Sequence, residues 1–368
     1  MVLDHLAVYL SNSCNMACSY CYVSVNQGPS VHLSFKQIKD SIDEFFQKVP
    51  GPDRKITFLG GEPLLNWPIF TRAATYARQK GGPDVVLQAF TNGTLLTPDK
   101  LAFFEDIGLH VTISLDGRKA DNDSNRVYFK STERSVFDDV MKRLEALPDL
   151  SRLGVSLVFT SETIDHFLGN VDFFYRMGFS RITFNPEIYE TWSEDRLNVM
   201  RASLRGLTRY YRTILAEGMR PFQIQILFAV EESLKLNKAG VKWWHDCHNV
   251  VLGPEGKYYS CDKPLTLPIG TAKAQRVGGA AEGLNWEKRA RLLSEARDFV
   301  ESGPGANNEV FCPMGVYFYG KEAGKDPRPL LDNFHRVAAV FAEGMAELVA
   351  ECHTYPAYQD IYVDTRVV

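Results

Sequence analysis

The sequence has no long hydrophobic run and no marked excess of charge of one sign. Its 368 residues include 41 Lys and Arg against 45 Asp and Glu, which gives a formal net charge of −4. The longest apolar stretches, such as Val337–Phe341, are far shorter than the ~18 residues that a membrane span needs. No long Lys/Arg run marks a surface for nucleic acid. We therefore expect neither a membrane nor a nucleic-acid partner.

The amino terminus lacks the features of an export signal. The first ten residues have neither a cationic start nor an A-x-A-like cleavage site, so we expect a cytoplasmic protein. The seven cysteines are an odd number, which argues against a disulfide framework. In a reducing compartment, clustered cysteines more often bind metal or take part in chemistry.

Between residues 5 and 185, short apolar runs alternate with helical patterns. The runs are almost continuously apolar, as in strands buried on both faces of a parallel sheet. Six strands are expected: His5–Ser11, Lys55–Leu59, Val85–Phe90, His110–Leu115, Gly154–Phe159 and Arg181–Asn185. Ser34 with Gln37, and Thr97 before Pro98, have the form of helix start signals between them. Six β-then-α units predict an α/β fold, a partial (β/α)6 barrel of parallel strands.

The rhythm changes after Asn185. A long helix is expected over residues 193–216 and an amphipathic one over Phe334–Ala350, with an irregular, cysteine-containing stretch from about Gly240 onward. We place a domain boundary near residues 220–240. The sequence therefore predicts a barrel domain over 1–225 and a small C-terminal cysteine-containing domain over 226–368.

The strongest signal is a C-x3-C-x2-C spacing directly after the first expected strand, formed by Cys14, Cys18 and Cys21. Parallel α/β folds place their chemistry at the carboxyl ends of strands. A cubane iron–sulfur cluster has four irons, so three thiolates leave one iron open for a substrate or cosubstrate. A zinc site or three unrelated buried thiols is the alternative, although structural zinc usually has four ligands.

This spacing, with the aromatic Tyr20 before the last cysteine, resembles the signature of the radical S-adenosylmethionine (radical SAM) enzymes. The resemblance implies a [4Fe–4S] cluster whose open iron chelates the amino and carboxylate groups of SAM. It also implies that one electron cleaves SAM to methionine and a 5′-deoxyadenosyl radical, which abstracts hydrogen from the substrate. An external donor such as flavodoxin or ferredoxin is expected to supply the electron.

The segments that follow the next strands fit the same resemblance. The sequence Gly60-Gly61-Glu62-Pro63 looks like the GGEP motif that binds the SAM amino group. Ser114 and Asp116 could bond ribose hydroxyls, and Arg126 could pair with the methionine carboxylate through its bidentate fork. Plain glycine, Asn-Gly and Asp-Gly turns are the alternative. The expected SAM-binding residues are Tyr20, Gly60, Gly61, Glu62, Pro63, Asn92, Ser114, Asp116 and Arg126.

Two cysteines, Cys247 and Cys261, frame an expected hairpin whose turn is Pro254-Glu-Gly256. The pattern resembles the C-x9–15-G-x4-C opening of SPASM and twitch extensions, which bind auxiliary iron–sulfur clusters, although the first gap here is eight residues. A full SPASM region has more cysteines than Cys312 and Cys352 supply. The expected small domain is therefore SPASM/twitch-like, with one auxiliary [4Fe–4S] cluster on these four cysteines.

The fourth ligand of that cluster is open, since His245, His248 or a free coordination site could replace Cys352. Buried thiols without metal are the other interpretation. In anaerobic sulfatase-maturing enzymes, a Cys-Asp pair in a similar hairpin carries a general base. Asp262 is therefore a candidate catalytic residue, or a hairpin-end aspartate that bonds local backbone.

Together these resemblances predict a radical SAM enzyme, an oxidoreductase-type maturase of ribosomal peptides or proteins. Hydrogen abstraction from the substrate would yield a crosslink, an oxidation or an epimerised centre. Because only 13 residues precede Cys14, we expect no separate N-terminal leader-binding domain. Two alternatives are a radical SAM dehydrogenase of a small molecule such as an aminocyclitol, and a non-catalytic metal-binding scaffold.

Overall fold

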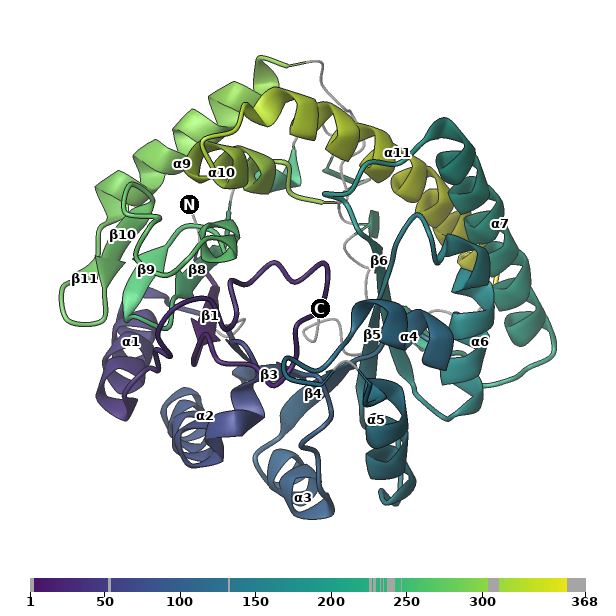
Figure 1. Cartoon of the computed structure of the whole chain (residues 1–368), viewed down its shortest axis with the longest axis horizontal. Helices are drawn as coiled ribbons and strands as arrows, with labels where there is room; N and C mark the ends of the chain where they lie inside the picture. The colour runs from purple at the N-terminus through teal and green to yellow at the C-terminus, as the bar shows by residue number, and fades with distance from the viewer. Residues whose placement is uncertain are drawn as a thin grey trace.

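The computed structural model describes residues 3–51, 54–131, 133–224, 227, 230–231, 233, 235–236, 242–245, 247–303 and 311–355. In this part of the chain the strands form one sheet in the order β11-β10-β9-β8-β1-β2-β3-β4-β5-β6-β7. The sheet bends around the centre of the molecule, and helices cover its outer side (Figure 1). None of the described helices is long and apolar enough to cross a membrane.

Six neighbouring parallel strands confirm the predicted α/β barrel wall. They are β1 (His5–Tyr9), β2 (Lys55–Leu59), β3 (Val86–Thr91), β4 (Leu109–Ser114), β5 (Gly154–Phe159) and β6 (Arg181–Pro186). The register pairs Val8 of β1 with Phe58 of β2, and both side chains are buried. Because parallel strands all end at the same edge of the sheet, the loops that follow β1 to β4 meet there.

The helices between these strands are α1 (Phe35–Lys48), α2 (Trp67–Gly81), α3 (Pro98–Asp106), α4 (Lys119–Asn125), α5 (Val136–Glu145), α6 (Phe167–Arg176) and α7 (Glu194–Ala216), with 3-10 turns η1 (Pro63–Asn66) and η2 (Ile164–His166). Ser34 and Gln37 form the predicted capping box of α1, and Thr97 caps α3. The polar helix α4 was not predicted, because its residues are weak helix formers.

The predicted hairpin between Cys247 and Cys261 is present, as the antiparallel strands β8 (Asn249–Leu252) and β9 (Lys257–Tyr259). Gly256 has a φ of +75°, which the turn requires. β8 also pairs with β1 in parallel, so the hairpin continues the barrel sheet directly. The sheet ends at β7 (Gln223–Ile224) on one side, and at β10 (Arg276–Gly279) and β11 (Gly283–Leu284) on the other.

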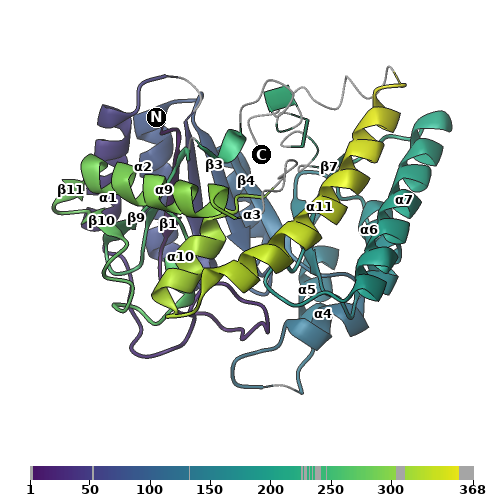
Figure 2. The same ribbon diagram turned by 90° about the horizontal axis from the view of Figure 1, so that it is seen from above.

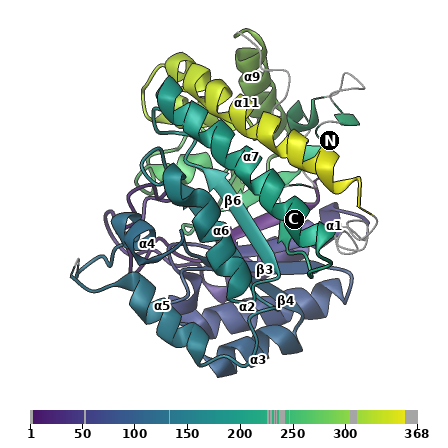
Figure 3. The same ribbon diagram turned by 90° about the vertical axis from the view of Figure 1, so that its right-hand side faces the viewer.

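The C-terminal helices join the two ends of this open sheet. They are α9 (Trp286–Glu301), α10 (Met314–Glu322) and α11 (Pro327–Cys352), with 3-10 turns η3 (Trp243–His245) and η4 (Lys263–Thr266). From α10, which contacts η4, α11 runs across to α7 and lies along it (Figures 2 and 3). α11 begins seven residues earlier than predicted, because Pro327 occupies the first turn, where proline is tolerated.

Two buried clusters of hydrophobic side chains matter for the site. The larger one fills the space between the barrel strands and their helices, and it includes Val337 and Phe341 of α11. A smaller one lies among α9, α10 and the start of α11, around Trp244 and Phe334. Strands of both predicted domains therefore belong to one sheet, and α11 of the second domain packs into the core of the first. The boundary between the two domains stays a prediction.

Candidate functional site

Cys14, Cys18 and Cys21 line one cavity of about 380 Å³ at the carboxyl ends of the barrel strands. The residues of its wall include seven of the nine that the sequence singles out for SAM: Tyr20, Gly60, Gly61, Glu62, Asn92, Ser114 and Arg126. Pro63 and Asp116 lie outside the described wall. The fold thus brings together residues from four different strand ends around the three thiols.

An asparagine that the sequence analysis missed fixes the three-cysteine loop. Asn26 accepts a hydrogen bond from the backbone N–H of Cys14 at 3.1 Å. Its amide donates to the carbonyls of Cys14 at 2.9 Å and Met16 at 3.2 Å. Asn26 has a φ of +58°, a conformation that asparagine tolerates better than most residues. Its only signal in the sequence is an asparagine in a turn-rich stretch.

The two glycines after β2 allow that strand end to press against the three-cysteine loop. The Gly61 N–H donates to Ser11 O at 2.7 Å, and the Glu62 N–H donates to Ser13 O at 2.9 Å. A Cβ on Gly61 would lie 2.1 Å from Ser13 O and 2.9 Å from Cys14 N. Gly60 has a φ of +150°, and a Cβ there would lie 2.9 Å from Ser11 O. Both positions therefore require glycine.

The buried carboxylate of Glu62 ties the end of β2 to the end of β3. One of its oxygens accepts from the Leu64 N–H at 3.0 Å and the Thr91 hydroxyl at 2.8 Å, and the other from the Asn92 N–H at 2.8 Å. Burial raises the pKa of Glu62, and these hydrogen bonds oppose the shift. Since its oxygens already have partners in the protein, binding of the SAM amino group by this motif stays a prediction.

Asn92 connects the turn after β3 to the three-cysteine loop. Its amide donates to Asn15 Oδ1 at 2.8 Å and lies 3.9 Å from the Cys14 sulfur. Its own oxygen accepts from Thr94 Oγ1 at 2.6 Å and from the Thr94 N–H at 3.1 Å. The side chain therefore holds the loop in place from inside the cavity.

Asp116 holds two cavity residues, Arg126 and Tyr20. Arg126 Nη2 donates to Asp116 Oδ1 at 2.9 Å, and the Tyr20 hydroxyl donates to Asp116 Oδ2. The Val158 N–H also donates to Asp116, at 3.0 Å. Both members of the Arg126–Asp116 ion pair are buried, and the Arg126 Nε has no hydrogen-bond partner among the described residues. A buried N–H without a partner on a cavity wall fits an anionic ligand such as a carboxylate.

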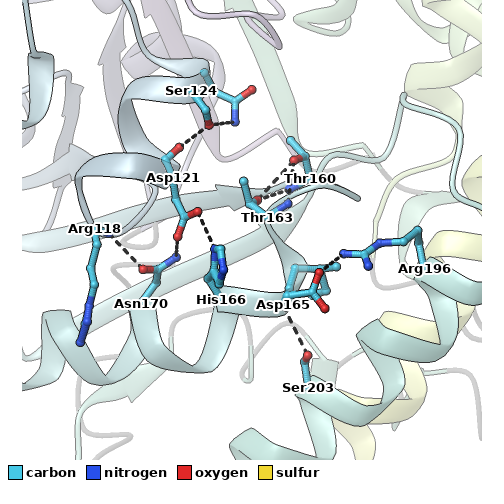
Figure 4. Close-up of polar contacts among 12 residues, drawn as sticks. Arg118, Asp121, Ser124, Thr160, Thr163, Asp165, His166, Asn170, Arg196 and Ser203 are labelled. Carbon is cyan, nitrogen blue, oxygen red and sulfur yellow. Dashed lines mark hydrogen bonds and ion pairs between the residues drawn. The ribbon is translucent and has the colours of Figure 1, made fainter.

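A polar network keeps the polar helix α4 in place (Figure 4). The buried Asp121 of α4 accepts from Asn170 Nδ2 of α6 at 2.7 Å, and its other oxygen lies 2.8 Å from His166 Nδ1. Asn170 also accepts from the Arg118 N–H at 3.0 Å. Because Arg126 directly follows α4, this network sets where the guanidinium enters the cavity.

The thiols of the three-cysteine loop fit a cluster better than a single ion. Burial raises the pKa of Cys14 and Cys21, and raises that of Cys18 to about 11. Without a positive centre these sulfurs are therefore neutral thiols, whereas metal ligation requires thiolates. Among the described residues, no three Cys, His, Asp or Glu side chains are arranged to hold a metal ion. The ligands of a cubane bind different irons, so they lie farther apart than those of one ion.

Three of the four C-terminal cysteines lie together, and the fourth lies elsewhere. Cys247, Cys261 and Cys312 all pack against the smaller cluster around α9 and α10. Cys352 is fully buried in the larger barrel core instead. It is the last residue of α11, a 26-residue helix about 39 Å long that starts beside α10. The predicted grouping of Cys352 with the other three is therefore not what the fold arranges.

Asp262 lies just after β9, between the two proposed centres. Its carboxylate accepts from the Tyr9 hydroxyl at 3.5 Å, and Tyr9 is 3.1 Å from the Tyr22 hydroxyl. Its other oxygen lies 3.5 Å from the Cys261 sulfur and 3.5 Å from Lys263 Nζ. Asp262 is not among the described residues that line the cavity, whereas Tyr22 and Lys263 are. A role as general base therefore stays a prediction.

A second, outer cavity of about 450 Å³ adjoins the first. The two share the side chains of Tyr20, Cys21, Tyr22, Glu187, Tyr189 and Lys263. Lys263 lies in the shared wall, with its Nζ 4.3 Å from the ring centre of Tyr22 and 5.6 Å from that of Tyr189. The sequence analysis did not single out Lys263 or Tyr189. The outer cavity offers a second ligand a place next to the first.

Comparison with known proteins finds a matching family model and related sequences. Residues 8–174 match the family model of the Radical SAM superfamily. The chain is 25% identical over 284 residues to a serine-type anaerobic sulfatase-maturating enzyme of Klebsiella aerogenes, covering 73% of this chain and 69% of that protein. It is 26% identical over 210 residues to the radical SAM cyclopropyl synthase TigE of Paramaledivibacter caminithermalis, covering 52% and 43%.

A solved structure shares the fold of almost the whole chain. It is described as native anSMEcpe with bound AdoMet and Cp18Cys peptide. The TM-score is 0.64 at 17% identity, over 91% of this chain and 99% of that one. The sequence match over residues 8–174 and the three-cysteine loop at the end of β1 together show that this chain contains a Radical SAM domain.

Proposed function

We propose that this protein is a radical SAM peptide maturase that uses SAM to abstract a hydrogen atom from a peptide or protein side chain. The observation that carries the proposal is the lining of one cavity by three thiols and by a buried arginine with an unpartnered N–H. The thiols would hold a [4Fe–4S] cluster, which supplies one-electron cleavage of bound SAM. Arg126, held by Asp116, would bind the SAM carboxylate through Nε.

The other wall residues then have supporting roles. Asn26 and Asn92 fix the three-cysteine loop, and Gly60 and Gly61 let the end of β2 close against it. The carbonyls of the Gly60–Pro63 segment would accept hydrogen bonds from the SAM ammonium group. With SAM in the inner cavity, a substrate side chain would enter through the outer one, past Tyr189 and Lys263.

An auxiliary [4Fe–4S] cluster would bind to Cys247, Cys261 and Cys312. Their shared packing against α9 and α10 supports this ligand set. Cys352 is left out because it belongs to the other core. The fourth iron would then be free for a ligand other than cysteine. An external electron donor such as flavodoxin or ferredoxin completes the proposal.

Peptide substrates are favoured because curated relatives include a sulfatase-maturating enzyme and because the solved relative was determined with a bound peptide. The test is anaerobic incubation of the reconstituted protein with SAM, reductant and serine- or cysteine-containing peptides, followed by mass spectrometry. An oxidation or a crosslink should remove two hydrogen atoms from the peptide. An epimerisation should instead exchange the hydrogen at an α-carbon for deuterium. If the protein turns over an aminocyclitol and none of the peptides, the substrate is a small molecule and the peptide assignment is wrong.

Arg126 provides a site-specific test of SAM binding. Arg126→Gln removes the proposed carboxylate partner, and we expect the KM for SAM to rise about tenfold or more. Arg118→Gln is the matched control, because Arg118 lies at the other end of the same helix and its guanidinium stacks on Phe173. Equal KM values in the two variants would refute the assignment.

A further inference from the structure

Arg289, on α9, is a fully buried arginine beside the proposed auxiliary cysteines. Its Nη2 donates to the Cys247 carbonyl at 2.7 Å and the Asn249 carbonyl at 2.9 Å. A fully buried positive charge is costly to place, and this one lies against the backbone of Cys247.

The charged side chains around these cysteines determine how strongly the charge of Arg289 acts on them. Asp262 and Lys263 lie beside Cys261 as an ion pair of 3.5 Å, so their charges largely cancel. Arg289 adds a positive charge on the Cys247 side, in the low-dielectric interior, where its field is least screened. The Arg289 guanidinium lies 2.7 Å from the Cys247 carbonyl oxygen. Arg289 thus favours negative charge at Cys247.

We propose that Arg289 is a positioning residue that raises the reduction potential of the auxiliary cluster. This inference rests on the proposed binding of that cluster to Cys247, Cys261 and Cys312. Addition of one electron makes an iron–sulfur cluster one unit more negative, and a buried positive charge next to one of its ligands stabilises the reduced form. The electron donor in the test below is dithionite.

The test isolates the auxiliary cluster in the full-length chain by changing Cys14, Cys18 and Cys21 to serine. The protein is reconstituted anaerobically, its iron and sulfide are counted, and its reduction potential is measured by dithionite titration followed by electron paramagnetic resonance. Arg289→Met and Arg289→Gln remove the charge, and Gln keeps an N–H donor for the carbonyls. Arg289→Lys keeps the charge. Arg297→Gln is the control, because Arg297 lies on the same helix and its Nη2 donates to the His245 carbonyl.

We expect the neutral variants at Arg289 to lower the ratio of reduced to oxidised cluster at least tenfold at a fixed potential, a shift of 59 mV for one electron. Arg289→Lys and Arg297→Gln should stay within threefold of the parent. If the neutral variants lose their iron but Arg289→Lys keeps it, rescue by charge supports the proposal. Unchanged potentials in iron-loaded neutral variants, or loss of iron in the Lys variant as well, would overturn it.

The same experiment separates this inference from the proposed function on which it depends. A parent protein that takes up about four irons with sulfide has the auxiliary cluster, and the potentials then decide the role of Arg289. A parent that takes up no iron lacks the auxiliary cluster. That result refutes the proposed ligand set and removes the basis for a role of Arg289, whatever its variants do.

Discussion

Substitution of Gly61 by alanine tests how tightly the end of β2 must close on the three-cysteine loop. The added Cβ would lie 2.1 Å from Ser13 O and 2.4 Å from Ser13 C, both backbone atoms that no side-chain rotation can move away. Ordinary contact begins near 3.4 Å, so the two segments must separate by about 1.3 Å. Overpacking of this kind costs about 1–3 kcal/mol of folding stability.

The same displacement should impair chemistry more than folding. Misplacement of a reacting group by about 1 Å costs roughly 100-fold in rate. We therefore expect Gly61→Ala to form 5′-deoxyadenosine from SAM about 100-fold more slowly than the parent, in anaerobic assays with dithionite. Urea unfolding of the same preparation measures the loss of stability separately.

The matched control for this prediction is Gly169→Ala, in α6. A Cβ there meets no atom within 4 Å, and alanine is the better helix former by about 1 kcal/mol, so stability should rise slightly and activity should not change. A Gly61→Ala protein with full activity and parental stability would show that the glycine is not needed for close approach. The role assigned to the β2 end would then be wrong.

Three further outcomes follow from other parts of the molecule. Asp116→Ala leaves Arg126 buried without its carboxylate, so the free energy of unfolding in urea should fall by about 3–5 kcal/mol, whereas a fall under 1 kcal/mol would contradict the ion-pair geometry. The Cys352→Ala variant should keep the full iron content, whereas Cys312→Ala should lose about four irons. Equal iron counts in the two variants would refute the assignment of the auxiliary cluster to Cys247, Cys261 and Cys312. Burial lowers the pKa of His5 well below 6.5, so the folded state binds fewer protons than the unfolded one and stability should fall as the pH drops below 6.5. The loss should grow as the pH falls further and should vanish in His5→Gln.

Much of the barrel could be predicted because its signals are local. Runs such as Gly154–Phe159 are apolar except for one serine, Ser156, as is typical of strands buried on both faces. The C-x3-C-x2-C spacing and the glycines after β2 are contiguous in the sequence, so their meeting in one cavity required only the rule that parallel strands end together. The hairpin between Cys247 and Cys261 was predictable from its turn for the same reason.

The remainder depends on contacts between distant residues, which spacing does not encode. The pairing of β8 with β1 joins segments about 245 residues apart in the sequence, and no local sequence pattern predicts this pairing. Cys352 was grouped with the other cysteines by residue type alone, whereas the length of α11 carries it into the other core. The ion pair of Asp116 with Arg126 was not predicted, and contact of Asp116 with a ribose stays a prediction. The polar helix α4 depends on Asp121 and its partners in α6.

The central claim is that Cys14, Cys18 and Cys21 bind an iron–sulfur cluster that cleaves SAM. The most direct measurement is the formation of 5′-deoxyadenosine and methionine from SAM by the dithionite-reduced, reconstituted protein under strict exclusion of oxygen, beside a Cys18→Ser variant. We predict that the parent forms both products in equal amounts and that the variant forms neither. Reduced parent protein that contains iron and sulfide but leaves SAM intact, with or without peptide, would contradict the account.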